Sequence, residues 1–388
     1  MTASDLIGLS KTARCDWIAL GLIAGVGPVT FARLVATFGS PTNVLAAPLR
    51  ELAAHVGVSV ALAIHQGADP AQLTQVLDWA NRPGHTLLTL AESSYPRLLR
   101  EIAAPPPTLY VLGRAALVDT GGIAIVGSRN ASAQGLSDTA EFARALCDQG
   151  ITIVSGLALG IDAAAHRAAL AAGGKTVAVL GTGIDVVYPR SNRALFDALA
   201  VDGAIISEFA LGTPPAAANF PQRNRLISGL THGCLVIEAA IHSGSLITAR
   251  LAAEQGREVF ARPGSIHATL TKGCHALIKE GAKLVETSAD IVEELGLGYV
   301  PHHAPVPAPP PSSAPAPQSP SALAITAAIT PAITPDALSL ALGFDPVDPD
   351  TLCMRLGLTP DLVSAMLLTL EIDGVVAALP GGRYQRLK

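Results

Sequence analysis

The chain has 388 residues, of which 49% are hydrophobic and 15% charged, and its formal net charge is −5. This length exceeds the usual size of one domain, so two or three domains are expected. The negative charge excludes a broadly basic surface, and a nucleic-acid site would have to be a local positive pocket. Because no long apolar run and no basic leader segment occurs, we expect a cytoplasmic protein with no membrane contact.

The five cysteines stand far apart, and none belongs to a CxxC pair. They are Cys15, Cys147, Cys234, Cys274 and Cys353. This spacing disfavours both a zinc site and a disulfide framework. We therefore predict no metal and no cofactor, in a reducing compartment.

The first 80 residues have a helical spacing of apolar residues. The run from Ile23 to Pro28, with Phe31, Leu34 and Val35 after it, resembles a helix-hairpin-helix, and Leu52–Ile64 around Gly57 resembles a degenerate second copy. Glycines permit the tight turn, and the N–H groups at the following helix start can hold a phosphate. Only Arg33 adds charge nearby, so a purely structural turn is the alternative.

From residue 122 onward, short β-branched runs alternate with Ala-rich helical segments. The predicted strands are Ile123–Val126, Ile151–Val154, Val177–Leu180, Ala204–Ile206, Cys234–Ile237, Glu258–Ala261 and Lys283–Val285. Continuous apolar strands alternating with helices are typical of a mostly parallel sheet covered on both faces. The sequence therefore predicts an α/β fold with a Rossmann-like core.

Nine prolines fall between Pro301 and Pro320, a composition that favours an extended linker. Beyond it, helices are expected at Pro335–Leu342, Asp350–Leu356 and Thr359–Leu370, followed by two strands that form a wing. This pattern predicts a winged helix. The expected domains are a helical helix-hairpin-helix or SAM-like domain over 1–90, the Rossmann-like core over 91–298, the linker over 299–322 and the winged helix over 323–388.

Small and polar residues gather where the predicted parallel strands end, and ligands bind outside those ends. The residues are Gly127, Ser128 and Arg129 after the first strand, Ser155 and Gly156 after the second, and Gly181-Thr182-Gly183 after the third. Glycines let the backbone approach an anion, and hydroxyls and helix starts donate to phosphate. Arg129 adds a fixed charge, with a salt bridge to Glu208 or Asp162 as the alternative. The run G-S-R-N-A-S is no dinucleotide fingerprint, which disfavours nicotinamide chemistry and ATP hydrolysis.

A second group of candidate residues lies between Asn219 and Arg225. Phe220, Arg223, Asn224 and Arg225 offer a ring for stacking, guanidinium groups for phosphates and an amide for a base edge, a mixture that suits a single strand. Arg190 can extend the same positive track. Alternatively, Arg223 and Arg225 tie this segment to Glu208 and Glu238, or one arginine does each job.

Two further motifs invite an enzymatic interpretation. Asp162 and His166 share a helix face, but we favour an Asp that caps the helix and orients a buried His over an acid/base pair. Ser243-Gly244-Ser245 lacks the pattern of a nucleophile turn and resembles an anion-binding helix start.

Taken in order, these motifs resemble the DNA-processing protein A (DprA/Smf) family over almost the whole chain. The resemblance is carried by Tyr95–Leu99, Pro105–Tyr110, Ala124–Arg129, Val154–His166, Gly181–Asp185, Tyr188-Pro189, Ser207-Glu208, Phe220–Arg225, Ser243–Ala249 and Pro263-Gly264. Arg262 and Cys274-His275 depart from the usual pattern.

The resemblance implies a non-enzymatic homodimer that binds incoming single-stranded DNA in natural transformation, protects it and loads the RecA recombinase. It implies that Arg129 and Arg190 form the DNA-binding pocket near the Phe220–Arg225 segment, and that dimer and RecA surfaces lie around Ile266–Ile278. The rival interpretation is a nucleoside-monophosphate phosphoribohydrolase, but the P-G-G-x-G-T-x-x-E run of those enzymes is absent here.

The predicted winged helix carries four basic and seven acidic residues over 321–388, a net charge of −3. Asp361, Glu371 and Asp373 lie on or beside its expected recognition helix. We therefore expect this domain to contact protein or to regulate the core, and not to read duplex DNA.

Overall fold

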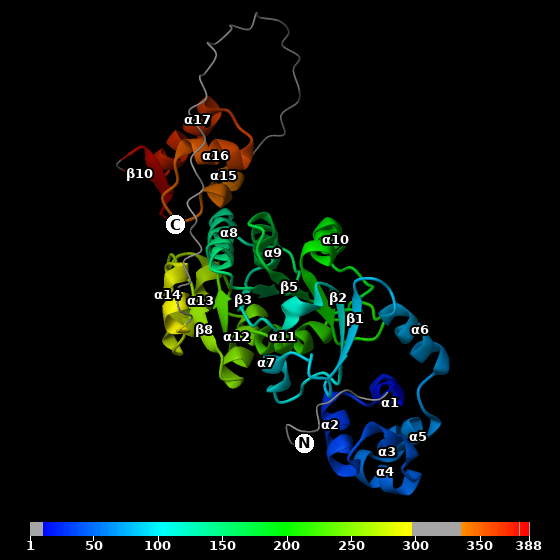
Figure 1. Ribbon diagram of the computed structural model, residues 1–388. Helices are drawn as coiled ribbons and strands as arrows, with labels where there is room; N and C mark the ends of the chain where they lie inside the picture. The colour runs from blue at the N-terminus through cyan, green and yellow to red at the C-terminus, as the bar shows by residue number, and fades with distance from the viewer. Residues whose placement is uncertain (1–10, 297–334, 380, 388) are drawn as a thin grey trace, which may run out of the picture. The chain divides into compact units, whose positions relative to one another are not determined.

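The structure is a computed structural model that describes residues 11–296, 335–379 and 381–387 (Figure 1). The chain divides into two compact units, Met1–Gly298 and Tyr299–Lys388. The predicted linker over 299–322 lies outside the described residues. Each unit is considered by itself below.

The first unit begins with six helices. They are α1 (Lys11–Leu22), α2 (Pro28–Phe38), α3 (Pro41–Ala46), α4 (Leu49–Val56), α5 (Val58–Gln66) and α6 (Pro70–Ala80). Gly25 has a φ of +86° in the turn before α2, and Gly57, at +79°, joins α4 to α5. Trp17, Phe31 and Leu34 pack in one buried cluster with residues of α4 and α5. The predicted pair of helical hairpins is confirmed.

A nine-stranded sheet forms the centre of this unit. The strands are β1 (His85–Thr89), β2 (Thr108–Gly113), β3 (Ile123–Val126), β4 (Ile153–Ser155), β5 (Thr176–Val179), β6 (Ala204–Ser207), β7 (Gly233–Val236), β8 (Glu258–Ala261) and β9 (Lys283–Leu284). Their order is β1-β2-β6-β5-β4-β3-β7-β8-β9. The seven strands β3 to β9 are parallel to one another, whereas β2 pairs antiparallel with both β6 and β1 and so forms an antiparallel edge. The Rossmann-like prediction is confirmed.

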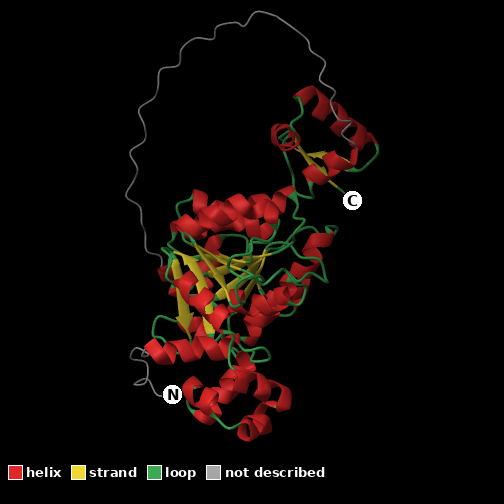
Figure 2. Cartoon of the chain, turned by 90° about the vertical axis from the view of Figure 1, so that its right-hand side faces the viewer, coloured by secondary structure: helices red, strands yellow, loops and turns green. Residues whose placement is uncertain are grey.

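Helices cover both faces of the sheet (Figures 1 and 2). One face carries α8 (Ala133–Asp148), α9 (Ile161–Ala171), α10 (Arg193–Asp202) and α14 (Ser288–Glu294), and the other carries α7 (Arg97–Arg100), α11 (Asn219–Gly229), α12 (Ser245–Glu254) and α13 (Lys272–Lys279). Short 3-10 helices span Ala115–Asp119, Arg190–Asn192 and Thr269–Thr271. Because both faces are covered, strands such as β3 and β7 are buried along their whole length, which explains their uninterrupted apolar sequence.

The antiparallel edge was not among the predicted strands. β1 pairs with β2 from His85 and Leu112 to Thr89 and Thr108, so the sheet starts before the domain boundary expected at residue 90. The buried Ile18 of α1 and Trp79 of α6 belong to the same cluster as Leu87 of β1. The helical segment and the sheet therefore share a core and form one unit.

The second unit is a winged helix. It contains α15 (Pro335–Leu342), α16 (Pro349–Leu356), α17 (Pro360–Ile372), β10 (Val376–Leu379) and β11 (Arg383–Arg386), with β10 and β11 antiparallel. The Asp348 side chain accepts a hydrogen bond from Thr351 N at the start of α16. Leu338, Leu352 and Leu367 belong to a buried cluster that lies within this unit. The predicted winged helix is confirmed.

Within the part of the chain that the structure describes, no single helix is long and apolar enough to cross a membrane. Only α16 and α17 taken together reach that length and composition, and they are bent by 110°.

Candidate functional site

A cavity of about 840 Å³ opens at the carboxyl edge of the parallel strands. After β3 the chain adds β4, β5 and β6 on one side, and then crosses to place β7, β8 and β9 on the other. The cavity lies at this reversal of strand order, which is where open α/β sheets bind their ligands. It is lined by residues that follow β3, β4 and β7 and by the first turns of α11 and α12. We call it the carboxyl-edge pocket.

Arg129 supplies the accessible charge of this pocket. Its side chain is exposed, and its Cζ lies 5.6 Å from the centroid of the Phe220 ring. Neither of the carboxylates considered from the sequence, Glu208 and Asp162, forms a salt bridge with it within the described residues. The ring therefore holds the guanidinium by a cation–π contact and leaves its N–H donors available.

Aromatic residues extend from Phe220 along one wall. The Tyr188 ring lies 5.6 Å from the Phe220 ring, measured between centroids, and also lines the pocket. Arg190 follows at the start of a 3-10 helix, where it is exposed and makes no ion pair with any described residue. Arg190 does not line the pocket itself, and it follows the pocket residue Tyr188 by two positions in the chain.

The glycines of the rim serve the close packing of loops. A Cβ at Gly127 would lie 2.7 Å from Ile161 Cγ1, and one at Gly160 would lie 2.2 Å from the carbonyl oxygen of Ser128. The Ser128 N–H donates to Glu238 O at 2.8 Å, and Ile161 N donates to Ser128 O at 3.1 Å. The backbone N–H groups of Ser128 and Ile161 are therefore occupied inside the protein, and the predicted contact of Gly127 and Ser128 with a phosphate stays a prediction.

Ser155 and Gly156 also face inward. The Ser155 hydroxyl is buried and donates to Ile125 O at 2.7 Å. Gly156 N and Ala158 N both donate to Asp162 Oδ2, at 3.1 and 3.3 Å. Asp162 therefore closes the loop after β4. The prediction that Ser155 and Gly156 contact DNA is corrected, because both use their polar atoms internally.

Arg223 lines the pocket but is almost fully buried. Its side chain is 4% exposed, and Nη1 donates to Gly156 O at 2.6 Å and to Val179 O. Burial lowers the pKa of Arg223 to about 10, an effect that Asp162 opposes. Burial raises the pKa of Asp162, and Arg223 opposes that shift in turn. The two charges compensate each other, so Arg129 remains the uncompensated cation nearby.

The side chain of Arg225 also forms its polar contacts inside the protein. It forms an ion pair with Glu208 and donates from Nη1 to Ala104 O at 2.6 Å. Burial raises the pKa of Glu208, and Arg225 opposes this shift. This is the structural alternative considered from the sequence, with Glu208 as the partner. Arg223 and Arg225 thus hold α11 in place, which corrects their predicted role as phosphate contacts.

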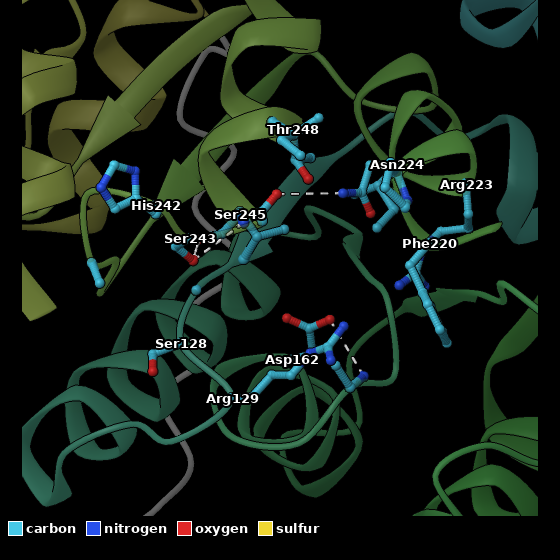
Figure 3. Close-up of a pocket in the computed structure, with 18 of the residues that line it drawn as sticks. Ser128, Arg129, Asp162, Phe220, Arg223, Asn224, His242, Ser243, Ser245 and Thr248 are labelled. Atoms are coloured by element: carbon cyan, nitrogen blue, oxygen red, sulfur yellow. Dashed lines mark hydrogen bonds between the residues drawn. The ribbon is translucent and has the colours of Figure 1, made fainter. Parts of the chain in front are cut away.

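The opposite wall of the pocket is polar (Figure 3). Asn224 Nδ2 lies 3.5 Å from Gly244 O, and the hydroxyls of Ser243 and Ser245 lie 2.6 Å apart. Ser245 N donates to Ser243 Oγ at 3.3 Å, so the start of α12 is partly satisfied by this turn. Exposed His242 also lines this wall and was not selected from the sequence, because a lone histidine carries no pattern.

His166 takes no part in the pocket. It is fully buried, and its Nδ1 lies 2.7 Å from Thr176 Oγ1, which donates its own proton to Ile153 O at 2.9 Å. Burial lowers the pKa of His166 to about 3. Thr176 therefore orients the imidazole, and the expectation that Asp162 does so was wrong.

Glu238 holds the start of α8. It is 4% exposed and accepts hydrogen bonds from Ser132 N at 2.9 Å and from Ser132 Oγ at 2.5 Å.

No group of three or more His, Cys, Asp or Glu side chains suited to a metal occurs among the described residues. The departure at Arg262 is explained by an ion pair with Asp138, in which Nε lies 2.5 Å from Oδ2.

The fold and the pocket together define a Rossmann-like protein with an arginine and aromatic rings at the switch point of its sheet. Family models described as "DNA recombination-mediator protein A", "DprA winged helix domain" and "DprA-like N-terminal HHH domain" match residues 86–296, 307–382 and 11–68. The chain belongs to the DNA-processing protein A (DprA/Smf) family.

Relatives and solved structures support this assignment. Protein Smf of Synechocystis is 35% identical over 97% of this chain and 100% of the relative, and Protein Smf of Escherichia coli is 42% identical over 80% of each. The X-ray structure of DNA processing protein A from Streptococcus pneumoniae has a TM-score of 0.64 and 37% identity, covering 74% of this chain and 99% of that one. A structure describing the single-stranded DNA binding mode of the Helicobacter pylori protein has a TM-score of 0.51 and 29% identity, covering 56% and 97%.

Proposed function

We propose that this protein binds single-stranded DNA in the carboxyl-edge pocket. Arg129 and Arg190 contact phosphates, Phe220 supports the strand, and Asn224 reaches a base edge, with Gly127 and Ser128 shaping the rim. One observation carries the proposal: the exposed guanidinium of Arg129 is held over the Phe220 ring and has no carboxylate partner among the described residues. The Helicobacter pylori relative, which is described as binding single-stranded DNA, supports it.

The charge distribution explains how a chain with a net charge of −5 holds an anionic strand. Arg223 and Arg225 are compensated by Asp162 and Glu208, so the interior near the pocket adds little net charge. Exposed arginines then dominate the local potential, and phosphate contacts through them make binding dependent on salt.

The proposal is tested by fluorescence anisotropy of a labelled oligo-dT strand over a salt series. We compare wild type with Arg129→Ala/Arg190→Ala and with the control Arg144→Ala, which removes an exposed arginine of α8 several turns from the pocket. Loss of two phosphate contacts makes the slope of log K against log salt shallower by roughly 1.4, at about 0.7 per contact for single strands. The control keeps the wild-type slope. Absence of binding by wild type would overturn the proposal.

We further propose that the protein acts in the cytoplasm as a non-enzymatic homodimer that protects incoming DNA in natural transformation and loads RecA onto it. The family resemblance supports this role. Loading is tested by measuring the lag before RecA hydrolyses ATP on a strand coated with single-strand binding protein. We expect this protein to shorten that lag. The test for the dimer is light scattering, with a mass twice that of the 39.6 kDa chain expected.

The phosphoribohydrolase alternative is disfavoured by the placement of the acidic residues. Glu238 is engaged by Ser132, and Asp162 is engaged by two backbone N–H groups. Incubation with nucleoside monophosphates is expected to release no free base. Release that is lost in Glu238→Gln would restore the enzyme hypothesis.

A further inference from the structure

Tyr188 stands out among the aromatic residues of the pocket because its ring is accessible. The side chain is 42% exposed and lines the carboxyl-edge pocket. Its ring plane is inclined by 38° to that of Phe220, with the ring centroids 5.6 Å apart. Large exposed aromatic side chains that line a pocket are strong candidates for ligand contact.

Phe220, the aromatic residue selected from the sequence, is less accessible than Tyr188. It is half-buried and lies over Gly181, where a Cβ would come within 2.9 Å of its Cδ1. Arg129 and Tyr188 occupy two further positions around the ring. Phe220 is therefore the support on which the other two side chains rest, and Tyr188 presents the more open π-face.

The charged and aromatic groups follow one another along the wall. Arg129 contacts Phe220, Phe220 contacts Tyr188, and Arg190 follows Tyr188 two residues later in the loop between β5 and α10. An exposed cation, Arg129, thus contacts one ring of the aromatic pair, and a second exposed cation, Arg190, follows the other ring two residues later in the chain. A single strand offers phosphates along its backbone and bases that stack on rings, so this alternation matches both of its parts.

We propose that Tyr188 is a nucleobase-stacking subsite, on which one base of the strand lies next to the phosphate bound by Arg129. This proposal rests on the proposed function and adds a contact of a different kind. Stacking on a ring tolerates every base, so the subsite contributes affinity without sequence preference.

A purely supporting role for Tyr188, in which it only keeps Phe220 in place, makes different predictions. Tyr188→Leu keeps apolar bulk beside Phe220 but removes the π-face. Tyr188→Phe keeps the ring and removes only the hydroxyl, which has no hydrogen-bond partner among the described residues. If Tyr188 stacks on a base, Tyr188→Leu should bind the strand more weakly than Tyr188→Phe. If Tyr188 only supports Phe220, the two variants should bind with similar affinity.

The experiment uses the full chain and an oligo-dT strand that carries a single 2-aminopurine, whose fluorescence reports stacking. Base–aromatic stacking contributes roughly 1–3 kcal/mol. We expect Tyr188→Leu to weaken binding about tenfold, which corresponds to about 1.4 kcal/mol. The affinity of Tyr188→Phe should lie within about twofold of the wild-type affinity, because the ring that stacks on the base is kept. The salt slope should stay unchanged, because no phosphate contact is lost.

Val201→Ala serves as the matched control, because it removes an exposed apolar side chain from α10 at a position that does not line the pocket. Equal affinity and equal 2-aminopurine fluorescence for wild type and Tyr188→Leu would overturn the subsite while leaving the proposed function intact. A shallower salt slope in Tyr188→Leu would assign the residue a supporting role. Absence of binding by wild type would instead remove the proposed function itself.

Discussion

The guanidinium of Arg223 occupies the space that a side chain at Gly156 would need. A Cβ at residue 156 would lie 2.5 Å from both terminal nitrogens of Arg223. The same arginine donates to the carbonyl oxygen of Gly156, so the glycine and the arginine fit together as one buried element. This pairing joins the loop after β4 to α11, and thereby fixes one wall of the carboxyl-edge pocket.

Gly156→Ala is therefore expected to destabilise the protein. The added methyl group must displace a buried side chain that is hydrogen-bonded to two carbonyl groups, and overpacking of this kind costs about 1–3 kcal/mol. Urea unfolding measures the loss. Gly244→Ala is the control, since Gly244 has a helical φ of −61° and a Cβ there would meet nothing within 4 Å. Equal stability of the two variants would contradict the assignment.

Arg225→Ala should reduce stability without changing the salt slope of DNA binding. The substitution leaves Glu208, which is 4% exposed, without its ionic partner, and removing one member of a buried pair costs about 3–5 kcal/mol. The loss should diminish as the pH falls toward the raised pKa of Glu208, because protonation relieves the buried charge. A shallower slope in the folded variant would return Arg225 to the phosphate contacts.

The sequence predicts the fold well where the pattern depends on burial. All seven parallel strands are predicted to within two residues of their ends. Central strands such as β3 and β7 are uninterrupted apolar runs because both faces of the sheet are covered there, whereas β9 at the edge is exposed. The β1–β2 edge is missed, because Thr89, which ends β1, and Thr108, which begins β2, are buried by packing that the sequence does not display.

The sequence predicts a candidate site at the carboxyl ends of the strands, where the structure has the carboxyl-edge pocket, but it does not distinguish the roles of the arginines near it. Sequence spacing places Arg129, Arg223 and Arg225 near one another and cannot tell an exposed guanidinium from a buried one. The orientation of α11 on the sheet buries the side chains of Arg223 and Arg225, whereas Arg129, in the loop after β3, is exposed. Tyr188 was noted only as the residue before Pro189, because its contact with Phe220 joins segments far apart in the chain.

His166 should make stability depend on pH in a defined direction. Its folded pKa of about 3 lies below the ordinary value of 6.5, so between these values the unfolded chain binds the extra proton. The stabilisation is complete above pH 6.5 and declines as the pH falls toward 3, by about 1.4 kcal/mol for each pH unit. Asp162 and Glu208, whose pKa values are raised, act in the opposite direction.

The contribution of His166 is isolated by comparison with His166→Asn, in which the two carboxylates are unchanged. Between pH 7.5 and 5.5, wild type should lose about 1.4 kcal/mol more unfolding free energy than the variant, as one pH unit below 6.5 requires. Parallel pH profiles for the two proteins would contradict the lowered pKa, because they would show that the imidazole binds its proton as readily in the folded state as in the unfolded chain.

The winged helix should not bind duplex DNA. Its third helix, α17, contains no Lys or Arg, and Asp361, Glu371 and the adjacent Asp373 are exposed. Leu368 and Ile372 are 58% and 77% exposed on the same helix, so its accessible surface is apolar and acidic. A surface of this composition repels phosphates and suits contact with protein.

A fragment spanning residues 321–388 tests this directly, because the buried cluster of the unit lies within the fragment. Circular dichroism verifies that the fragment folds, and anisotropy of a labelled duplex then measures binding. At about 150 mM salt we expect no affinity tighter than roughly 100 μM, the weak end of non-specific binding. Tighter binding that weakens as salt is raised would show that α17 contacts phosphates despite its acidic residues, and would move duplex recognition to this domain.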